Sequence, residues 1–313
     1  MKKDSLPNFI VVGFPKCGST ALHYYLENHP EIFMPVQKEL HFFTSNKLLK
    51  LNNGPGDKEV KKFMITSIED YQKAYKNTKN EKVIGEVSPS YINHPDSIPF
   101  IKKTLGEPKI IILLRDPVKR AYSNYLHLLR EKRENLSFLE ALKKEDIRKE
   151  EKYSDFWYYK FNSTYFDKVD KFKKSFDDVL LLTQEDLNNN TVRTIKNIYS
   201  FLGVSIRSPE NINQQYNTGG IYEDNFITNL FLKQSILRSS LKKMIPITPK
   251  MKVFKEKLMA RYQKKAPPIS KEAENYLLEY FKEDVSKLND IYDVDISNWN
   301  NQFMAYNKAK NSN

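Results

Sequence analysis

Cysteine is nearly absent from this sequence. Cys17 is the only cysteine among 313 residues, which rules out a disulfide within the chain and a cysteine-based zinc site. Long apolar runs are missing too, because none approaches the roughly 18 residues that a membrane-spanning helix needs. The N-terminal MKKDSLPNFIVVGF has too short an apolar part for a signal peptide. These absences predict a cytoplasmic protein in a reducing compartment, with no membrane span.

The balance of charge is basic. Lys and Arg together number 51 against 39 Asp and Glu, which gives a formal net charge of +12. A basic protein attracts anions such as nucleic acids, membrane surfaces or phosphorylated and sulfated ligands. A basic nucleic-acid-binding protein is therefore the non-enzymatic alternative, but the lysines are spread along the chain and runs such as 171-KFKK-174 are short. We expect no nucleic-acid partner.

Strands alternating with helices predict the fold class. Short, continuous apolar runs rich in Ile, Val and Leu are typical of parallel strands covered on both faces, and they occur at 9–13, 83–87, 109–114 and 179–183. Helical patterns occur at 19–28, 68–77, 96–105, 117–132, 164–175 and 190–202. The pattern predicts an α/β fold with a P-loop-like parallel β-sheet of four to five strands flanked by helices.

The C-terminal third predicts helices rather than strands. A polar loop is expected at 211–225, helices are expected at 226–243, 251–264 and 270–291, and the terminal NKAKNSN is expected to be frayed. The prediction is one domain over 1–313, with an α/β core at about 8–204 and a helical C-terminal part at about 205–300.

The stretch 13-GFPKCGST-20 joins the first predicted strand to the first predicted helix. A glycine turn before a helix directs backbone N–H groups at one point beside the positive end of the helix dipole, so it favours an anion. The glycine spacing is that of an ATP-binding loop, but Ser19 stands where the ATP-binding lysine belongs and the only lysine, Lys16, lies inside the loop. With no obvious magnesium-binding Asp beyond Asp116, ATP chemistry is disfavoured.

FPKCGSTAL resembles the 5′-phosphosulfate loop of the sulfotransferases that use 3′-phosphoadenosine 5′-phosphosulfate (PAPS). Within that family the lysine of the loop contacts the transferred sulfuryl group and the leaving phosphate, and Lys16 has its position. The resemblance implies that PAPS is the donor, that 3′,5′-ADP (PAP) is the product, and that no metal is required. It implies a donor-binding loop formed by Lys16, Cys17, Gly18, Ser19, Thr20 and Ala21.

A second stretch supports the resemblance. The run 109-KIIILLRDPVKRAYSNYLHLLR-130 resembles the family's strand and helix that bind the 3′-phosphate of the donor. The resemblance assigns that role to Arg115, whose guanidinium can bind phosphate through two hydrogen bonds, and to the hydroxyl of Ser123. The stretches 84-IGEVSPSY-91 and 163–204 and the C-terminal helix also resemble the family, so the likeness spans nearly the whole chain.

The general base is expected in 38-KELHFF-43. Heparan-type sulfotransferases use the glutamate of such a stretch as base, whereas cytosolic steroid and phenol sulfotransferases use a histidine. The resemblance therefore assigns the base to Glu39, with His41 as the alternative base or a residue that orients the glutamate. If 39–43 is extended, Glu39 and His41 lie on the same side of the strand.

These observations predict an enzyme, a PAPS-dependent sulfotransferase that sulfates a hydroxylated acceptor. The motif pattern is nearest to the heparan and Golgi-type carbohydrate enzymes, but Val87 replaces a lysine common in that group and the group's disulfide is impossible. We therefore expect another glycan, a glycolipid or a small metabolite as acceptor. The alternatives are a P-loop NTPase or kinase-like enzyme and an inactive PAPS-binding protein. The stretch 217-NTGG-220 is a weak match to the loop that covers the 3′-phosphate of the donor in the family.

Overall fold

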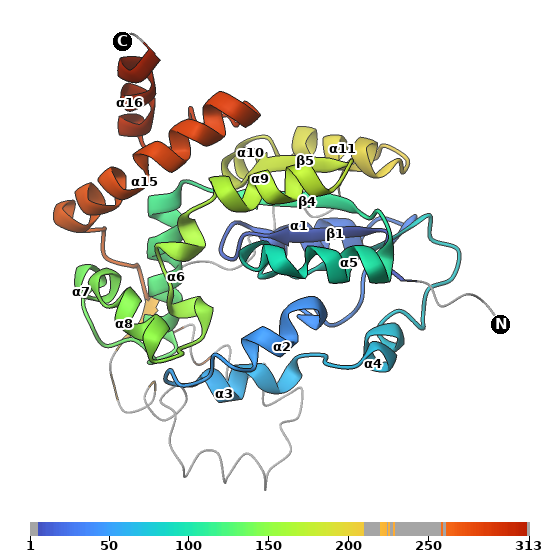
Figure 1. Ribbon diagram of the computed structural model, residues 1–313, viewed down its shortest axis with the longest axis horizontal. Coiled ribbons are helices and arrows are strands. Elements are labelled where there is room, and N and C mark those ends of the chain that lie inside the picture. Colours follow the sequence, from blue (N-terminus) through green and yellow to red (C-terminus); the bar gives the residue numbers. More distant parts are fainter. Residues whose placement is uncertain are drawn as a thin grey trace, which may run out of the picture.

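The central feature of the computed structural model is a five-stranded parallel sheet (Figure 1). The structure describes residues 6–209, 220–223, 225, 228, 258 and 261–311. The strands lie in the order β2-β3-β1-β4-β5, and every neighbouring pair is parallel. Their bounds are β1 (Phe9–Gly13), β2 (Ile32–Phe33), β3 (Val83–Val87), β4 (Lys109–Leu114) and β5 (Val179–Thr183). The predicted fold class is confirmed, and the two-residue β2 is the strand of this sheet that the sequence patterns missed.

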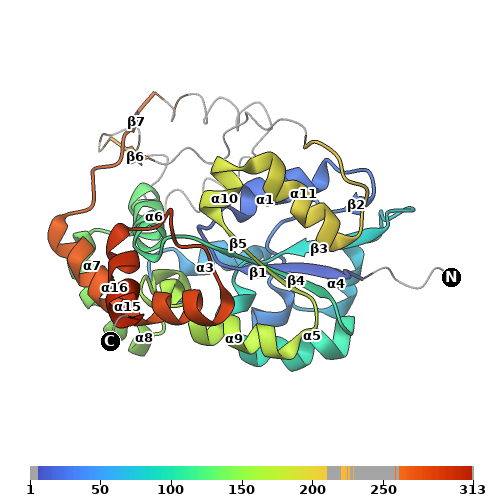
Figure 2. The ribbon, with the colours of Figure 1, turned by 90° about the horizontal axis from the view of Figure 1, so that it is seen from above.

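Helices cover both faces of the sheet, as the view from above shows (Figure 2). One face carries α1 (Ser19–Glu27), α10 (Gln184–Asn189) and α11 (Thr191–Leu202), and the other carries α5 (Ile98–Leu105) and α9 (Phe166–Ser175). All five residues of β1 are buried, as expected for a strand that is both central and covered twice.

Beyond the carboxyl end of β4 lies a group of helices that contact one another. They are α6 (Pro117–Arg130), α7 (Phe138–Lys143), α8 (Glu145–Glu150), α15 (Lys271–Tyr292) and α16 (Asn301–Asn311). Short helices α2 (Ser45–Leu48), α3 (Asp57–Val60) and α4 (Ile68–Lys73) fill the segment between β2 and β3. The sequence patterns did not predict α7, α8 or α16, because each is short or lacks a strong apolar repeat.

The C-terminal part differs from expectation in two places. Gln263–Lys264 forms β7, which pairs antiparallel with β6 (Ile221–Tyr222), where a helix was expected. The terminus is helical to Asn311 rather than frayed, because Phe303 is buried in the core and Asn307 donates to Asn289 Oδ1 at 3.0 Å. The expected helix 226–243 and loop segment 211–219 lie outside the described residues, apart from 228.

The strand order brings the functional segments together. β3 lies on one side of β1 and β4 on the other, so the chain reverses its direction of winding at β1. In an open α/β sheet, ligands bind outside the carboxyl ends of the strands at such a point. The segments that follow β1, β3 and β4 therefore meet at one edge, and Gly13 allows this closeness because a Cβ there would lie 2.4 Å from Ile92 Cγ2.

Candidate active site

A cavity of about 1000 Å³ opens at this edge of the sheet, and the loop after β1 forms one wall. Gly18 has a φ of +95°, which a residue with a side chain rarely adopts. This turn starts α1 at Ser19, so the first amides of the helix have no acceptor within the helix. Ser19, Thr20 and Ala21 line the cavity. The loop has the unpaired donors and the dipole that an anion requires.

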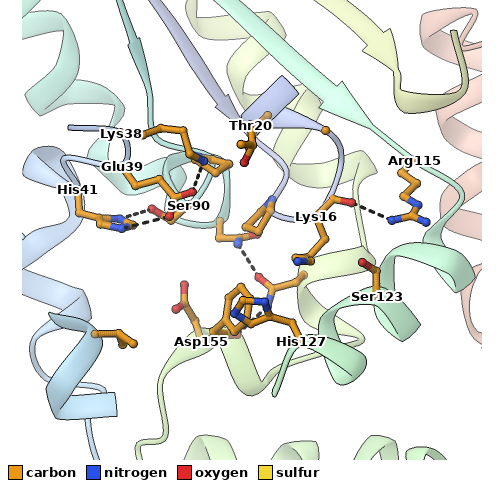
Figure 3. A pocket seen from close by; sticks show the side chains of 18 of the residues that line it. Lys16, Thr20, Lys38, Glu39, His41, Ser90, Arg115, Ser123, His127 and Asp155 are labelled. Atoms are coloured by element: carbon orange, nitrogen blue, oxygen red, sulfur yellow. Dashed lines mark hydrogen bonds and ion pairs between the residues drawn. The ribbon is translucent and has the colours of Figure 1, made fainter. Parts of the chain in front are cut away.

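Lys16 also lines the cavity, and its amine lies near Ser123 and His127 (Figure 3). The residue has a φ of +70°, and its carbonyl accepts a hydrogen bond from Arg115 Nη1 at 3.1 Å. Burial, together with the nearby charges of Arg130, Arg115 and Arg120, lowers the pKa of Lys16 from 10.5 to about 8. Positively charged side chains therefore gather at this wall of the cavity.

The second predicted anchor faces the same cavity. Arg115 follows β4 directly, and Ser123 lies two turns along α6; both line the cavity (Figure 3). Tyr165 donates its hydroxyl to the Arg115 carbonyl at 2.9 Å and so fixes the backbone there. The two stretches identified separately in the sequence thus meet in space.

Asp116 has a structural role. Its Oδ1 accepts from the amides of Val118 at 2.9 Å and Lys119 at 3.1 Å, which caps the N-terminus of α6. Its Oδ2 accepts from the Asn300 amide at 2.9 Å. The carboxylate is fully buried in these contacts, and the described part of the chain contains no group of three His, Cys, Asp or Glu side chains placed to hold a metal ion.

Glu39 and His41 lie on the opposite wall of the cavity (Figure 3). Glu39 Oε1 is paired with Lys38 Nζ, and Glu39 Oε2 lies 3.8 Å from His41 Nε2. Burial alone would raise the pKa of Glu39, but Lys38, His41 and Lys16 together hold it below its usual value. The group is therefore an ionised carboxylate at neutral pH, which is the form that a general base needs.

The segment around these residues is not extended, contrary to the expectation from alternation. Glu39 and His41 have φ values of +61° and +57°, and Phe42–Thr44 forms a 3₁₀ turn. The Glu39 amide donates to the Val87 carbonyl at 2.9 Å, which holds this turn against the end of β3. The two side chains share the cavity because of this turn, and Phe43 is buried in the core instead.

His41 is oriented by a serine that the sequence analysis did not single out. Its Nδ1 lies 2.8 Å from Ser90 Oγ, and Ser90 also lines the cavity. Burial lowers the pKa of His41, although Glu39 and Asp155 oppose that effect. A mostly neutral His41 is better suited to orienting Glu39 than to pairing with it as a cation.

Farther along the cavity, α6 contributes two more residues that were missed. His127 and Arg130 line the cavity on the face of α6 that carries Ser123. His127 follows Ser123 by four residues, and Arg130 follows His127 by three. Arg130 Nη2 lies 3.1 Å from His127 Nδ1, and His127 Nε2 lies 3.3 Å from Glu131 Oε1. Because arginine only donates, Nδ1 must accept and Nε2 must carry the proton. The helical spacing from Ser123 could have revealed both.

Cys17 does not contribute its side chain. The thiol is fully buried in the core, and burial raises its pKa to about 12. The Cys17 amide donates to the Phe14 carbonyl at 3.3 Å, so it serves the turn. The thiol therefore faces the core rather than the cavity.

The geometry has parallels in known proteins. The model of the sulfotransferase family matches residues 7–208. The chain belongs to the sulfotransferase family. This confirms the family predicted from the sequence. A membrane-associated sulfotransferase kil1 of Dictyostelium discoideum is 41% identical over 123 residues, which are 38% of this chain and 22% of that protein.

Two further relatives extend the comparison. Carbohydrate sulfotransferase 15 of Mus musculus is 33% identical over 152 residues, covering 39% of this chain and 27% of that protein. A sulfotransferase from Alicyclobacillus acidocaldarius has the same fold, with a TM-score of 0.74 and 27% identity over 94% of this chain and 99% of that chain. The chain spans about a quarter of the length of the curated relatives it matches. The described helices include none long and apolar enough to span a bilayer.

Proposed function

We propose that the protein transfers a sulfuryl group from PAPS to a hydroxyl of a glycan, a glycolipid or a small metabolite. The observation that carries the proposal is that Lys16, Glu39, Arg115 and Ser123, from three separate segments, line one cavity. Lys16 and Glu39 have the chemistry needed at the reacting atoms. Arg115 and Ser123 can donate hydrogen bonds to a phosphate. Relatives named carbohydrate sulfotransferases support a glycan acceptor.

The residues present suit the donor. Unpaired amides at the start of α1 and the Lys16 amine form a receptor for the 5′-phosphosulfate, and Arg115 and Ser123 form one for the 3′-phosphate. PAPS supplies an activated sulfuryl group when bound. Sulfuryl carries less charge than phosphoryl, so the scheme requires no metal to neutralise it.

Glu39, Lys16 and His41 have separate roles in the transfer. Glu39 accepts the proton of the acceptor hydroxyl as that oxygen forms a bond to sulfur. Lys16 stabilises the negative charge that builds on the bridging oxygen as the bond between sulfur and the 5′-phosphate breaks. The products are a sulfate ester and PAP, with the proton on Glu39. His41, held by Ser90, orients the glutamate and keeps its carboxylate turned toward the cavity.

Calorimetry separates this function from its rivals. The protein should bind PAP without a metal and should not require magnesium–ATP. Binding of magnesium–ATP in preference to PAP would indicate an NTPase or kinase instead. Incubation with radiolabelled PAPS and a panel of glycans, glycolipids and small alcohols should then label one acceptor class. Tight PAP binding without transfer to any of these classes would indicate a donor-binding protein without catalysis.

A further inference from the structure

Arg120 is buried beneath the loop that follows β1, and it has no carboxylate partner among the residues that the structure describes. It lies on α6 and has no exposed surface. It donates four hydrogen bonds within the described part of the chain, all to neutral acceptors. They are the Pro15 carbonyl at 3.1 Å, the Tyr159 carbonyl at 3.2 Å, Ser163 Oγ at 3.0 Å and Asn124 Oδ1.

The other buried arginines of this region are arranged differently. Arg148 pairs with Glu134 at 2.8 Å, and Arg133 pairs with Asp57 at 2.5 Å. The carboxylate with the largest electrostatic effect on Arg120 is Glu145. Glu145 already accepts from the amides of Lys160 at 2.6 Å and Phe161 at 3.1 Å. Because a buried charge without a counter-ion costs several kcal/mol, such an arrangement in the ligand-free protein needs another explanation.

Arg120 cannot escape this cost by losing its proton. Lys16 and the buried Lys168 have pKa values lowered to about 8 and about 7, so each can become neutral near physiological pH. Lys168 Nζ donates to Asn93 Oδ1 at 3.0 Å and lies 3.7 Å from the centre of the Phe161 ring. A guanidinium remains charged at any physiological pH. Arg120 therefore adds a fixed positive charge beneath the loop, beside the arginines that line the cavity.

Arg120 also shapes the loop. Its Nε donates a hydrogen bond to the Pro15 carbonyl. Arg115 Nη1 donates to the next carbonyl, that of Lys16, at 3.1 Å. A peptide unit has its C=O and N–H on opposite sides. Because the Pro15 carbonyl turns toward Arg120, the Lys16 amide turns away from it, and Lys16 itself lines the cavity.

We propose that Arg120 is a positioning residue whose buried positive charge is balanced by the bound phosphosulfate of the donor rather than by a carboxylate of the protein. Its hydrogen bond to the Pro15 carbonyl holds the loop on the side away from the cavity, while the anion binds on the cavity side. The ligand-free protein therefore carries an unbalanced charge, which donor binding relieves. This inference rests on the proposed donor function.

The test compares variants that separate charge from shape. Arg120→Lys retains the charge, Arg120→Gln retains a hydrogen-bond donor without the charge, and Arg148→Gln is the control in which a carboxylate loses its partner. We expect PAP to bind Arg120→Gln at least tenfold more weakly and Arg120→Lys within about threefold of wild type. In the absence of PAP, Arg120→Gln should melt no lower than wild type, whereas Arg148→Gln should melt lower but retain the full PAP-induced rise in Tm.

A proton count supplies a readout that a merely structural residue would not change. The Lys16 pKa is lowered mainly by burial and then by the charges of Arg130, Arg115 and Arg120, while Glu39 opposes them. At pH 8, calorimetry in two buffers of different ionisation enthalpy should show that wild type takes up protons as PAP binds. Arg120→Gln should take up fewer, because its ligand-free Lys16 is already more protonated.

Three outcomes overturn the proposal. One is unchanged PAP affinity and proton uptake in Arg120→Gln. Another is loss of folding in Arg120→Gln or Arg120→Lys, which would make Arg120 a residue of the fold alone. The third is equal weakening in both Arg120 variants, which would exclude charge as the cause. Wild-type protein that fails to bind PAP would instead overturn the proposed function on which this inference rests.

Discussion

The protonation of Lys16 should set the alkaline limit of the reaction. Burial, reinforced by Arg130, Arg115 and Arg120, lowers the pKa of this amine from 10.5 to about 8 in the ligand-free protein. In the proposed mechanism the charged amine is the useful form, because it would stabilise charge on the leaving oxygen. Activity that depends on it is present below pH 8 and is lost as the pH rises through that value.

The size of the effect follows from the titration of one group. At pH 9 only about one-eleventh of the Lys16 amines carry a proton, so kcat/KM for the donor should fall about tenfold for each pH unit above 8, since that parameter reports groups of the free enzyme. The limb of kcat should lie at higher pH, because the bound phosphosulfate favours the charged amine.

The assay measures initial rates of radiolabel transfer from PAPS at saturating acceptor between pH 6 and 10. Lys16→Arg should keep its charge throughout this range and lose the limb, at some cost in kcat from its different reach. Lys76→Arg, on the exposed surface, serves as the matched control and should show the wild-type profile. A wild-type kcat/KM that stays flat to pH 10, or an unchanged limb in Lys16→Arg, would refute the role of Lys16.

Three further predictions concern the other residues. Glu39→Gln should lower kcat by about 10²–10⁴-fold with little change in PAP affinity; if His41→Ala is inactive while Glu39→Gln remains active, the histidine is the base. Arg115→Ala should weaken PAP binding in calorimetry by about tenfold to a hundredfold, the value of hydrogen bonds to a charged group, and unchanged affinity would exclude the 3′-phosphate assignment. Tyr71→Phe removes the hydroxyl that donates to buried Glu86 at 2.6 Å; urea unfolding should show a loss of about 1.5–3 kcal/mol, and a stability equal to wild type would contradict it.

Local signals explain what the sequence predicted correctly. The bounds of β1, β3, β4 and β5 agree with the apolar runs because a strand buried on both faces leaves a continuous pattern. The start of α6 agrees because Pro117 follows a capping Asp116. By contrast, β2 has only two residues, and it forms because Ile32 pairs with Val83 of β3. Such a strand is specified by its neighbour rather than by a pattern of its own.

The turn at Glu39 shows why the site was only partly predictable. Alternation placed Glu39 and His41 on one side of a strand, and both residues do face the cavity, but a strand is not the reason. Two residues with side chains adopt positive φ there, a conformation that costs about 1–3 kcal/mol each unless the surroundings impose it. The hydrogen bond from the Glu39 amide to the Val87 carbonyl and the one between the Ile65 amide and the Leu40 carbonyl impose it. These partners lie 25 to 48 residues away, so propensity could not have revealed them. Because the turn depends on the end of β3, the sheet that holds the loop after β1 also fixes the carboxylate opposite Lys16.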